Sequence, residues 1–365
     1  MNLVHRLSLL LLPLFAALPA CAAEDANKSG TDHAVVLVYH HVSEETPPST
    51  SVSPEQFAAH LDFLAREGFT VWPLSRILEH LENGRKLPAR TVALTFDDAY
   101  RSVYTHALPM LRSRNFPFTV FVTTDYIDGK SRLYLSWEQL REMTSQGAEI
   151  GNHSLSHPHL VRRRVGESEA QWRARVRAEV EGAQRRLREE LDPVPLFAYP
   201  YGEYTAEVKD IVKSLDLYGI AQQSGAVSPH SDFLAVPRFP MAANYAVIDR
   251  FARSVRTRAL PVTVLAPPEQ ILAGDQDHPE PLRLRLGEGP FALDQLACYA
   301  SVGGRLEIEW TNRAAREFEV RSPRPLGAGR TKFNCTAPHS EGSGSYYWYS
   351  HLWMKKRPDG SWYRE

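Results

Sequence analysis

Two adjacent aspartates, Asp97 and Asp98, directly follow an apolar, β-branched run at residues 91–96. Carboxylates this close repel each other, so either a positive charge offsets the repulsion or one of the two stays protonated. A metal ion bound by one carboxylate would resolve the conflict and leave the other to act as a base. The alternative is a solvated turn in which Asp98 caps the next helix.

Two histidines, His153 and His157, lie four residues apart. One helical turn would bring their rings to the same side, but Pro158 disfavours helical geometry at His157, so a tight loop fits as well. Two imidazoles and one carboxylate form a catalytic zinc set, which leaves positions open for water and substrate. Alone, the pair could equally be surface or core histidines. Together with Asp97 and Asp98 on one face of one fold, it predicts a metal site.

Three further segments carry ionisable or sharply turning residues at the ends of apolar runs. His40 and His41 follow the run at 35–39, a Tyr-Pro-Tyr-Gly sequence lies at 199–202, and Arg238 follows a later run at 234–237. In parallel α/β folds the carboxyl ends of the strands share one face, where active sites are built. We therefore expect these residues and the metal ligands to line one site.

The elements that would position these residues alternate from about residue 33 to residue 265. Most apolar runs are continuously apolar or β-branched, as expected of strands buried on both faces. The helices between them have recognisable starts, including capping boxes that begin at Ser53 and Ser136. This alternation predicts an α/β fold with a parallel sheet, open or closed into a barrel. The eight predicted strands are residues 35–39, 69–72, 91–96, 118–122, 148–151, 196–199, 218–222 and 234–237.

Beyond the α/β pattern, prolines punctuate a polar stretch at 266–281, which we interpret as a linker. Residues 282–365 are predicted to be β-rich. Within them we expect a hairpin between strands at 346–355 and 361–363, because Pro-Asp-Gly lies between these runs.

Two cysteines and a dense group of aromatic residues distinguish this C-terminal segment. Cys298 and Cys335 are expected to form a disulfide in an oxidising compartment, with two buried free thiols as the alternative. The aromatic side chains within 346–363 favour either the core of a β-sandwich or a face that stacks on sugar rings.

The start of the chain predicts export. Arg6 precedes an apolar run and a stretch of small residues, which is typical of a secretory signal peptide, here residues 1–23. The run is too short to span a bilayer comfortably, although a membrane anchor is the alternative. Residues 18–21, Leu-Pro-Ala-Cys, resemble a lipobox. The sequence therefore leaves open a soluble periplasmic form and an outer-membrane lipoprotein anchored through Cys21.

The charge balance of the 365-residue chain excludes no enzyme class but argues against some partners. The sequence has 42 Lys and Arg and 43 Asp and Glu, a formal net charge of −1. That balance gives no reason to expect nucleic acid or an anionic membrane as the main partner.

Three motifs together resemble those of a known family. Thr-Phe-Asp-Asp at 95–98, His-Ser-x-x-His at 153–157 and Tyr-Pro-Tyr-Gly at 199–202 are similar, in order and spacing, to the motifs of NodB-type polysaccharide deacetylases, carbohydrate esterase family 4. The resemblance implies a distorted (β/α) barrel, followed here by a small β-rich domain. The chain would then comprise a signal peptide (1–23), a catalytic domain (33–265), a linker (266–281) and a β-rich accessory domain (282–365).

The resemblance also implies roles for the site residues. Asp97 corresponds to the family's general base. Asp98, His153 and His157 correspond to the ligands of a divalent metal, usually zinc. The backbone N–H of Tyr201 corresponds to a group that helps to bind the oxyanion.

This chain departs from the family pattern at two points. Many members carry an arginine that pairs with the catalytic aspartate where this chain has Ala198. We expect Arg238 to supply that cation, with a salt bridge to a barrel helix as the alternative. The late Leu-x-His motif is not evident, and Val-Tyr-His at 38–40 instead opens the domain, as in circularly shifted members that deacetylate poly-N-acetylglucosamine. Because successive side chains of a strand point to opposite sides, we expect His40, rather than His41, to be the general acid.

These features predict an exported, metal-dependent hydrolase that removes acetyl groups, above all N-acetyl groups of GlcNAc units, from an acetylated polysaccharide. Two alternatives use the same fold: a peptidoglycan deacetylase and a hydrolase of small cyclic amides. A third is a catalytically silent glycan-binding scaffold. The presence of all the proposed catalytic and ligand residues favours an active enzyme.

Overall fold

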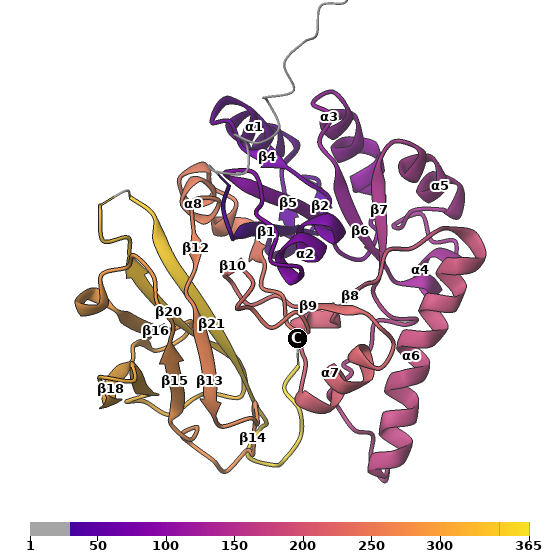
Figure 1. Ribbon diagram of the computed structural model, residues 1–365. Helices are drawn as coiled ribbons and strands as arrows, with labels where there is room; N and C mark the ends of the chain where they lie inside the picture. The colour runs from indigo at the N-terminus through magenta and orange to yellow at the C-terminus, as the bar shows by residue number, and fades with distance from the viewer. Residues whose placement is uncertain (1–29, 343, 365) are drawn as a thin grey trace, which may run out of the picture.

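A computed structural model describes residues 30–342 and 344–364. The predicted signal peptide, with Cys21, lies outside these residues. Within them, no helix is both long enough and apolar enough to cross a membrane. The α/β region and the β-rich region lie side by side (Figure 1).

A curled, mostly parallel sheet forms the centre of the α/β region, in the order β10-β1-β5-β6-β7-β8-β9. Two neighbouring strands, β1 (Ala34–Tyr39) and β5 (Thr91–Phe96), are buried at every position, as their unbroken apolar runs predict. With the β-rich region beside it, this sheet confirms the predicted fold class. The remaining strands are β4 (Thr70–Val71), β6 (Phe118–Val122), β7 (Ala148–Asn152), β8 (Leu196–Ala198), β9 (Tyr218–Ile220), β10 (Ala226–Val227) and β11 (Phe239–Pro240).

The barrel closes only through short pairings. The strand predicted at 234–237 is absent: Val236 forms an isolated parallel bridge with Ile220. Three residues further on, β11 begins at Phe239 and pairs with β1 instead. Pro237 interrupts this run, and because proline has no N–H to donate, it cannot sustain a ladder there. The distortion of the barrel is therefore concentrated just before Arg238.

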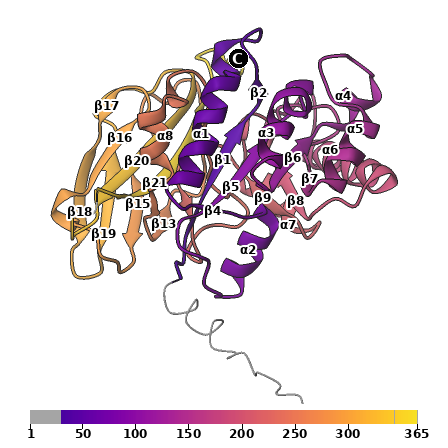
Figure 2. The same cartoon turned by 90° about the horizontal axis from the view of Figure 1, so that it is seen from above.

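Helices cover the sheet, and the two predicted capping boxes are confirmed. They begin α1 (Pro54–Arg66) and α5 (Trp137–Ser145), and a third, at Ser168, begins α6 (Glu169–Glu190). Figures 1 and 2 show α5 and α6 on the side of the sheet away from the β-rich region. The remaining α-helices are α2 (Leu74–Glu82), α3 (Leu108–Arg112), α4 (Thr124–Asp128), α7 (Ala206–Lys213) and α8 (Ile248–Ser254).

The β-rich region contains two sheets, ordered β12-β21-β20-β16-β17 and β13-β15-β19-β18, with β14 paired to β21. The strands are β12 (Arg258–Ala259), β13 (Val262–Ala266), β14 (Ile271–Leu272), β15 (Leu282–Leu286), β16 (Ala297–Ala300), β17 (Gly304–Arg305), β18 (Glu307–Asn312), β19 (Glu317–Arg321), β20 (Gly329–Pro338) and β21 (Tyr346–Lys355).

The sheets of the β-rich region begin earlier along the chain than the sequence indicated. Strand β13, placed by sequence at the end of the α/β region, pairs with β15. The segment interpreted as a linker contributes β14, which pairs with β21. Its prolines lie between these short strands and not within a ladder. The change from one architecture to the other therefore falls before residue 258, not at 265.

The hairpin predicted for strand β21 is also absent. The strand forms no hairpin with residues 361–363, which lie outside any strand, but pairs with β20 over ten residue pairs. The chain after β21 returns to the α/β region, where Tyr363 forms hydrogen bonds with Glu203 and Arg162. A disulfide joins Cys298 on β16 to Cys335, its direct partner on β20.

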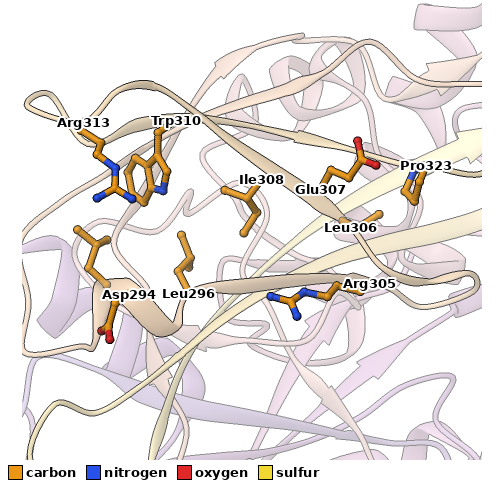
Figure 3. Close-up of a pocket in the computed structure, with 10 residues that line it drawn as sticks. Asp294, Leu296, Arg305, Leu306, Glu307, Ile308, Trp310, Arg313 and Pro323 are labelled. Carbon is orange, nitrogen blue, oxygen red and sulfur yellow. The ribbon is translucent and has the colours of Figure 1, made fainter.

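The aromatic residues near the C-terminus favour the core interpretation. Tyr347 and Trp353 belong to the interior of the sandwich, whereas Tyr346 is 49% exposed. A separate open pocket of about 540 Å³ lies elsewhere in the β-rich region (Figure 3), where Trp310 and Ile308 line one side. None of the predicted catalytic residues lines that pocket.

Candidate active site

A buried ion pair lies at the centre of the site. Arg238 donates from two nitrogens to the two carboxylate oxygens of Asp97, at 2.7 and 2.8 Å, and both side chains are fully buried. The guanidinium is itself held by the carbonyl of Ala221 (2.8 Å) and the hydroxyl of Thr95 (3.0 Å). The expected ion pair between Arg238 and Asp97 is therefore present.

The environment keeps Asp97 ionised. Burial alone would raise the pKa of this carboxyl, but the Arg238 guanidinium outweighs it and holds the pKa below its ordinary value. Gln222 donates a further hydrogen bond to Oδ2 of Asp97 (3.1 Å). A carboxylate offers about four acceptor positions. The three donors from Arg238 and Gln222 leave about one, on Oδ1, for a proton in transit.

Asp98, His153 and His157 form the group that could hold a metal ion. One ligand atom from each lies within 4.8 Å of the others. Oδ1 of Asp98 is 3.4 Å from Nε2 of His153 and 3.2 Å from Nε2 of His157. Although buried, this oxygen has no partner in hydrogen-bond geometry within the described chain. A buried carboxylate oxygen without a donor is costly, and a cation among the three ligands would satisfy it.

The two histidines present the nitrogen that a cation needs. Nδ1 of His153 is 2.8 Å from the carbonyl of Ala198, which can only accept, so Nδ1 carries the proton and Nε2 faces Asp98 with its lone pair. Burial lowers the pKa of His157 to about 4, so its imidazole is neutral at pH 7. Burial also lowers the pKa of His153, but the nearby carboxylates of Asp98 and Asp97 outweigh it and raise the pKa. The carboxylates therefore favour positive charge at this point.

Tight turns after the strands aim these side chains at one another. Asp98, Ser154, His157 and Tyr201 all have positive φ, between 56° and 70°. Residues other than glycine rarely adopt this backbone conformation outside turns and strained sites. Ser154 stabilises its loop, since its hydroxyl accepts from the N–H of His157 at 3.0 Å. The loop alternative to a helical His-x-x-x-His pair is the observed one.

His40 and His41 follow the last residue of β1 and face different surroundings. Nε2 of His40 lies 4.0 Å from Oδ2 of Asp97, and its side chain is 20% exposed. His41 turns away and stacks on Tyr100 with ring centroids 3.6 Å apart. Burial lowers the pKa of His41 to about 4. Of the two, His40 is the one within reach of Asp97 and solvent.

Tyr201 borders the cluster of Asp98, His153 and His157. Its ring lies edge-on to His157 at 4.6 Å and stacks on His159 at 3.8 Å. His159 in turn is 2.8 Å from Glu203, a fully buried carboxylate. Burial raises the pKa of Glu203, but its hydrogen bonds, first that with His159, outweigh it and lower the pKa. The His159–Glu203 pair thus packs against the ring of Tyr201 and supports the turn that contains it.

Sequence reasoning missed Gln222 and the His159–Glu203 pair. Gln222 could have been found, since it is the last residue of a predicted strand, and Asp97 and Arg238 come directly after theirs. His159 and Glu203 carry no comparable signal. They follow the His-x-x-x-His and Tyr-Pro-Tyr-Gly motifs closely but meet only in three dimensions.

Comparisons with known proteins agree with this geometry. The model of the polysaccharide deacetylase family matches residues 84–220, which include both aspartates, both ligand histidines and Tyr201 but neither His40 nor Arg238. The poly-beta-1,6-N-acetyl-D-glucosamine N-deacetylase of Escherichia coli strain K12 is 24% identical over 263 residues, covering 61% of this chain. The chain spans 38% of the length of that relative.

A second relative and two solved structures cover more of their own length. The enzyme of the same name from Staphylococcus aureus strain MRSA252 is 25% identical, over 55% of this chain and 71% of its own. IcaB from Ammonifex degensii superposes with a TM-score of 0.55 at 26% identity, covering 62% of this chain and 98% of IcaB. The deacetylase PplD from Streptococcus pyogenes has the same TM-score at 23% identity, with 61% and 98% covered, and supports the fold alone. This chain therefore carries a polysaccharide deacetylase domain of the NodB type, carbohydrate esterase family 4.

Proposed function

We propose that this protein hydrolyses the N-acetyl groups of a poly-β-1,6-N-acetylglucosamine type of glycan in a reaction that depends on a divalent metal. One observation carries the proposal: Asp97, held as an anion by Arg238, lies beside the Asp98–His153–His157 cluster at one end of the sheet. A base next to a cation site is the arrangement that hydrolysis of an acetamide requires. The names of the relatives support the choice of glycan.

Asp98, His153 and His157 would hold the cation, and zinc suits two imidazoles and a carboxylate. When bound, such an ion lowers the pKa of water and polarises a carbonyl oxygen. The chain's own residues supply the remaining chemistry. Asp97 accepts the proton of the attacking water at the open position of Oδ1, while Arg238 fixes the orientation of the carboxylate.

Two other groups complete the reaction. The backbone N–H of Tyr201, in the turn beside His157, donates to the oxygen that gains negative charge. His40 protonates the departing amine, because an amide anion is a very poor leaving group. The position of His40, 4.0 Å from Asp97 and partly open to solvent, supports this role.

We also propose that the protein works outside the cytoplasm. The Cys298–Cys335 disulfide supports this location, because disulfides persist in oxidising compartments. A soluble periplasmic form and a form anchored by lipid at Cys21 are the two candidates. Mass spectrometry of the mature N-terminus in cell fractions distinguishes them.

The test is acetate release from a panel of acetylated substrates, with metal content measured on the same preparation. We expect release from poly-N-acetylglucosamine, loss of release after thorough chelation, and recovery on addition of zinc or cobalt. Peptidoglycan and a small cyclic amide are the comparison substrates. Full turnover by metal-stripped protein would overturn the mechanism. Faster turnover of a comparison substrate would overturn the choice of glycan.

A further inference from the structure

Strand β20 of the β-rich region has one buried face and one half-buried face. Phe333 and Cys335 point into the sandwich, where they belong to its core. Side chains alternate along a strand, so Arg330 and Lys332 lie on the opposite face. That face is turned toward the α/β region, as the contacts of both residues with loops of that region show.

The neighbouring strand β21 completes this second face. Its residues Leu352 and Met354 pair with Lys332 and Arg330 in the β20–β21 ladder. Both apolar side chains are buried in a cluster with Phe197 of the barrel sheet and other residues of the α/β region. The sheet thus buries apolar surface on both sides, which explains why β21 is apolar over most of its length.

Two cations on this face bind the loops that carry the site. The guanidinium of Arg330 donates to the backbone carbonyl of Tyr201. The ammonium of Lys332 donates to the backbone carbonyl of Gln222 at 2.7 Å. The side chain of Gln222 donates to Oδ2 of Asp97 at 3.1 Å. Strand β20 is thereby connected to the proposed base, Asp97, through one intervening residue, Gln222. It is also hydrogen-bonded to the turn at Tyr201, which borders the ligand cluster.

A third anchor lies at the end of the chain. The hydroxyl of Tyr363 donates to Glu203, and the carbonyl of Tyr363 accepts from Arg162 at 3.0 Å. Glu203 also binds His159, whose ring stacks on Tyr201. The turn at Tyr201 is therefore held from two directions by residues that follow the barrel in sequence.

The contact made by Lys332 does more than hold the two regions together. Burial lowers the pKa of Lys332 to about 8, so the ammonium remains mostly charged at neutral pH but is largely withdrawn from water. A cation in such a place is costly unless an acceptor is fixed in front of it. An apolar residue would pack beside Leu352 and Met354 at lower cost. What the lysine adds is a directed hydrogen bond to one loop.

We propose that Arg330 and Lys332 are positioning residues of the deacetylase site, acting through Tyr201 and Gln222, so that the β-rich region completes the site and is not an accessory module. The proposal rests on the function proposed above. Its physical basis is that a displacement of about 1 Å in a catalytic group can cost on the order of 100-fold in rate. A purely structural role would instead lower stability and leave the rate of the folded enzyme unchanged.

The experiment uses the full chain with Arg330→Met and Lys332→Met, which keep a flexible stem and remove the charge. We expect each change to lower kcat by about 10- to 100-fold, with KM changed less than about 3-fold and metal content unchanged. Arg330→Lys should recover part of the loss. Arg283→Met, on the exposed face of the other sheet, is the matched control and should keep wild-type kcat.

Two further measurements separate positioning from folding and from the proposed activity. Gln222→Ala removes the bond to Asp97, so its loss of kcat should not add to that of Lys332→Met. Hydrogen–deuterium exchange, which needs no substrate, should rise at residues 199–204 and 221–224 in the methionine variants and remain unchanged elsewhere. Unchanged exchange at these loops would overturn the positioning role even if the wild type released no acetate. Wild-type acetate release combined with undiminished kcat in both variants would overturn it as well.

Discussion

The α/β region and the β-rich region place their charges in opposite ways. In the α/β region Asp97 and Arg238 form a pair in which neither side chain is exposed. In the β-rich region the pair Arg283–Glu319 lies on a sheet surface, with the arginine half exposed. A surface pair contributes little to stability, and a buried pair is weak evidence for stability because its desolvation is costly. Buried charge at the strand ends therefore indicates chemistry, whereas surface charge on the sandwich indicates solubility.

The β20 strand is where this contrast breaks down. Arg330 and Lys332 belong to the β-rich region by sequence, yet their charged ends contact the loops of the site. The role of a charged side chain therefore depends on the face on which it lies, and not on the domain that contains it. Changes at the strand ends should act on chemistry, and changes inside the sandwich on stability.

The largest expected effect comes from the centre of the buried pair. Asp97→Asn removes the base and leaves the three ligand side chains, so acetate release should fall about 10³-fold or more while metal content stays near the wild-type value. Metal analysis and single-turnover kinetics on the same preparation measure both. Loss of the metal together with activity would show that Asp97, and not Asp98 alone, belongs to the ligand set.

Asp98→Asn is the matched change one residue further on. It removes the charged ligand between His153 and His157, so zinc affinity should fall by about 100-fold or more. Activity should follow occupancy and recover in part at high zinc concentration. Isothermal titration of the metal-free protein provides the affinity. A variant that binds zinc as tightly as Asp97→Asn does would mean that the two roles are exchanged.

The sequence was sufficient for the strand ends because the signal there is local. An apolar run followed by Asp97 and Asp98 specifies a buried strand and the residues at its carboxyl end, and the structure places both as expected. The same reasoning brought Arg238 to Asp97, although the run before it forms a single bridge and no strand. The apolar pattern at 234–237 predicts a strand, but Pro237 has no N–H to donate to a ladder, so only the bridge of Val236 forms.

The contribution of the β-rich region could not be predicted, because it depends on which face of a strand meets which loop. Alternation alone shows that Arg330 and Lys332 share a face, but it does not identify the surface opposite. From sequence, the aromatic run of β21 could form either a sandwich core or a face that stacks on sugar rings. Only its pairing with β20 places Trp353 inside the sandwich. The linker predicted at 266–281 is wrong for a similar reason. This segment contributes β14, and a strand of two residues is too short to show a periodic pattern in the sequence.

His40→Ala should have an intermediate effect. Loss of the proton donor should lower turnover of an acetamide by about 100-fold, while an activated ester, whose leaving group needs no proton, should lose much less. His41→Ala is the control, because that ring stacks on Tyr100, whereas His40 is the histidine that approaches Asp97. Rates on both substrates decide the assignment. Equal losses on the two would indicate that His40 only positions Asp97, and a larger loss in His41→Ala would transfer the role.

The smallest expected effect on rate, and a large one on stability, comes from the disulfide. Cys335 lies on the sandwich face of β20, opposite the face of Arg330 and Lys332, and bonds to Cys298 across a separation of 37 residues. Opening a loop of this size should lower the free energy of unfolding by about 3–4 kcal/mol. We therefore expect the double variant Cys298→Ala/Cys335→Ala to unfold at lower denaturant concentration but to keep a kcat within about 2-fold of wild type where it is fully folded. Chemical denaturation and acetate release at the same temperature test this together. A variant that remains folded but loses kcat by 10-fold would show that the two faces of β20 are mechanically coupled, and the distinction between chemistry at one face and stability at the other would fail.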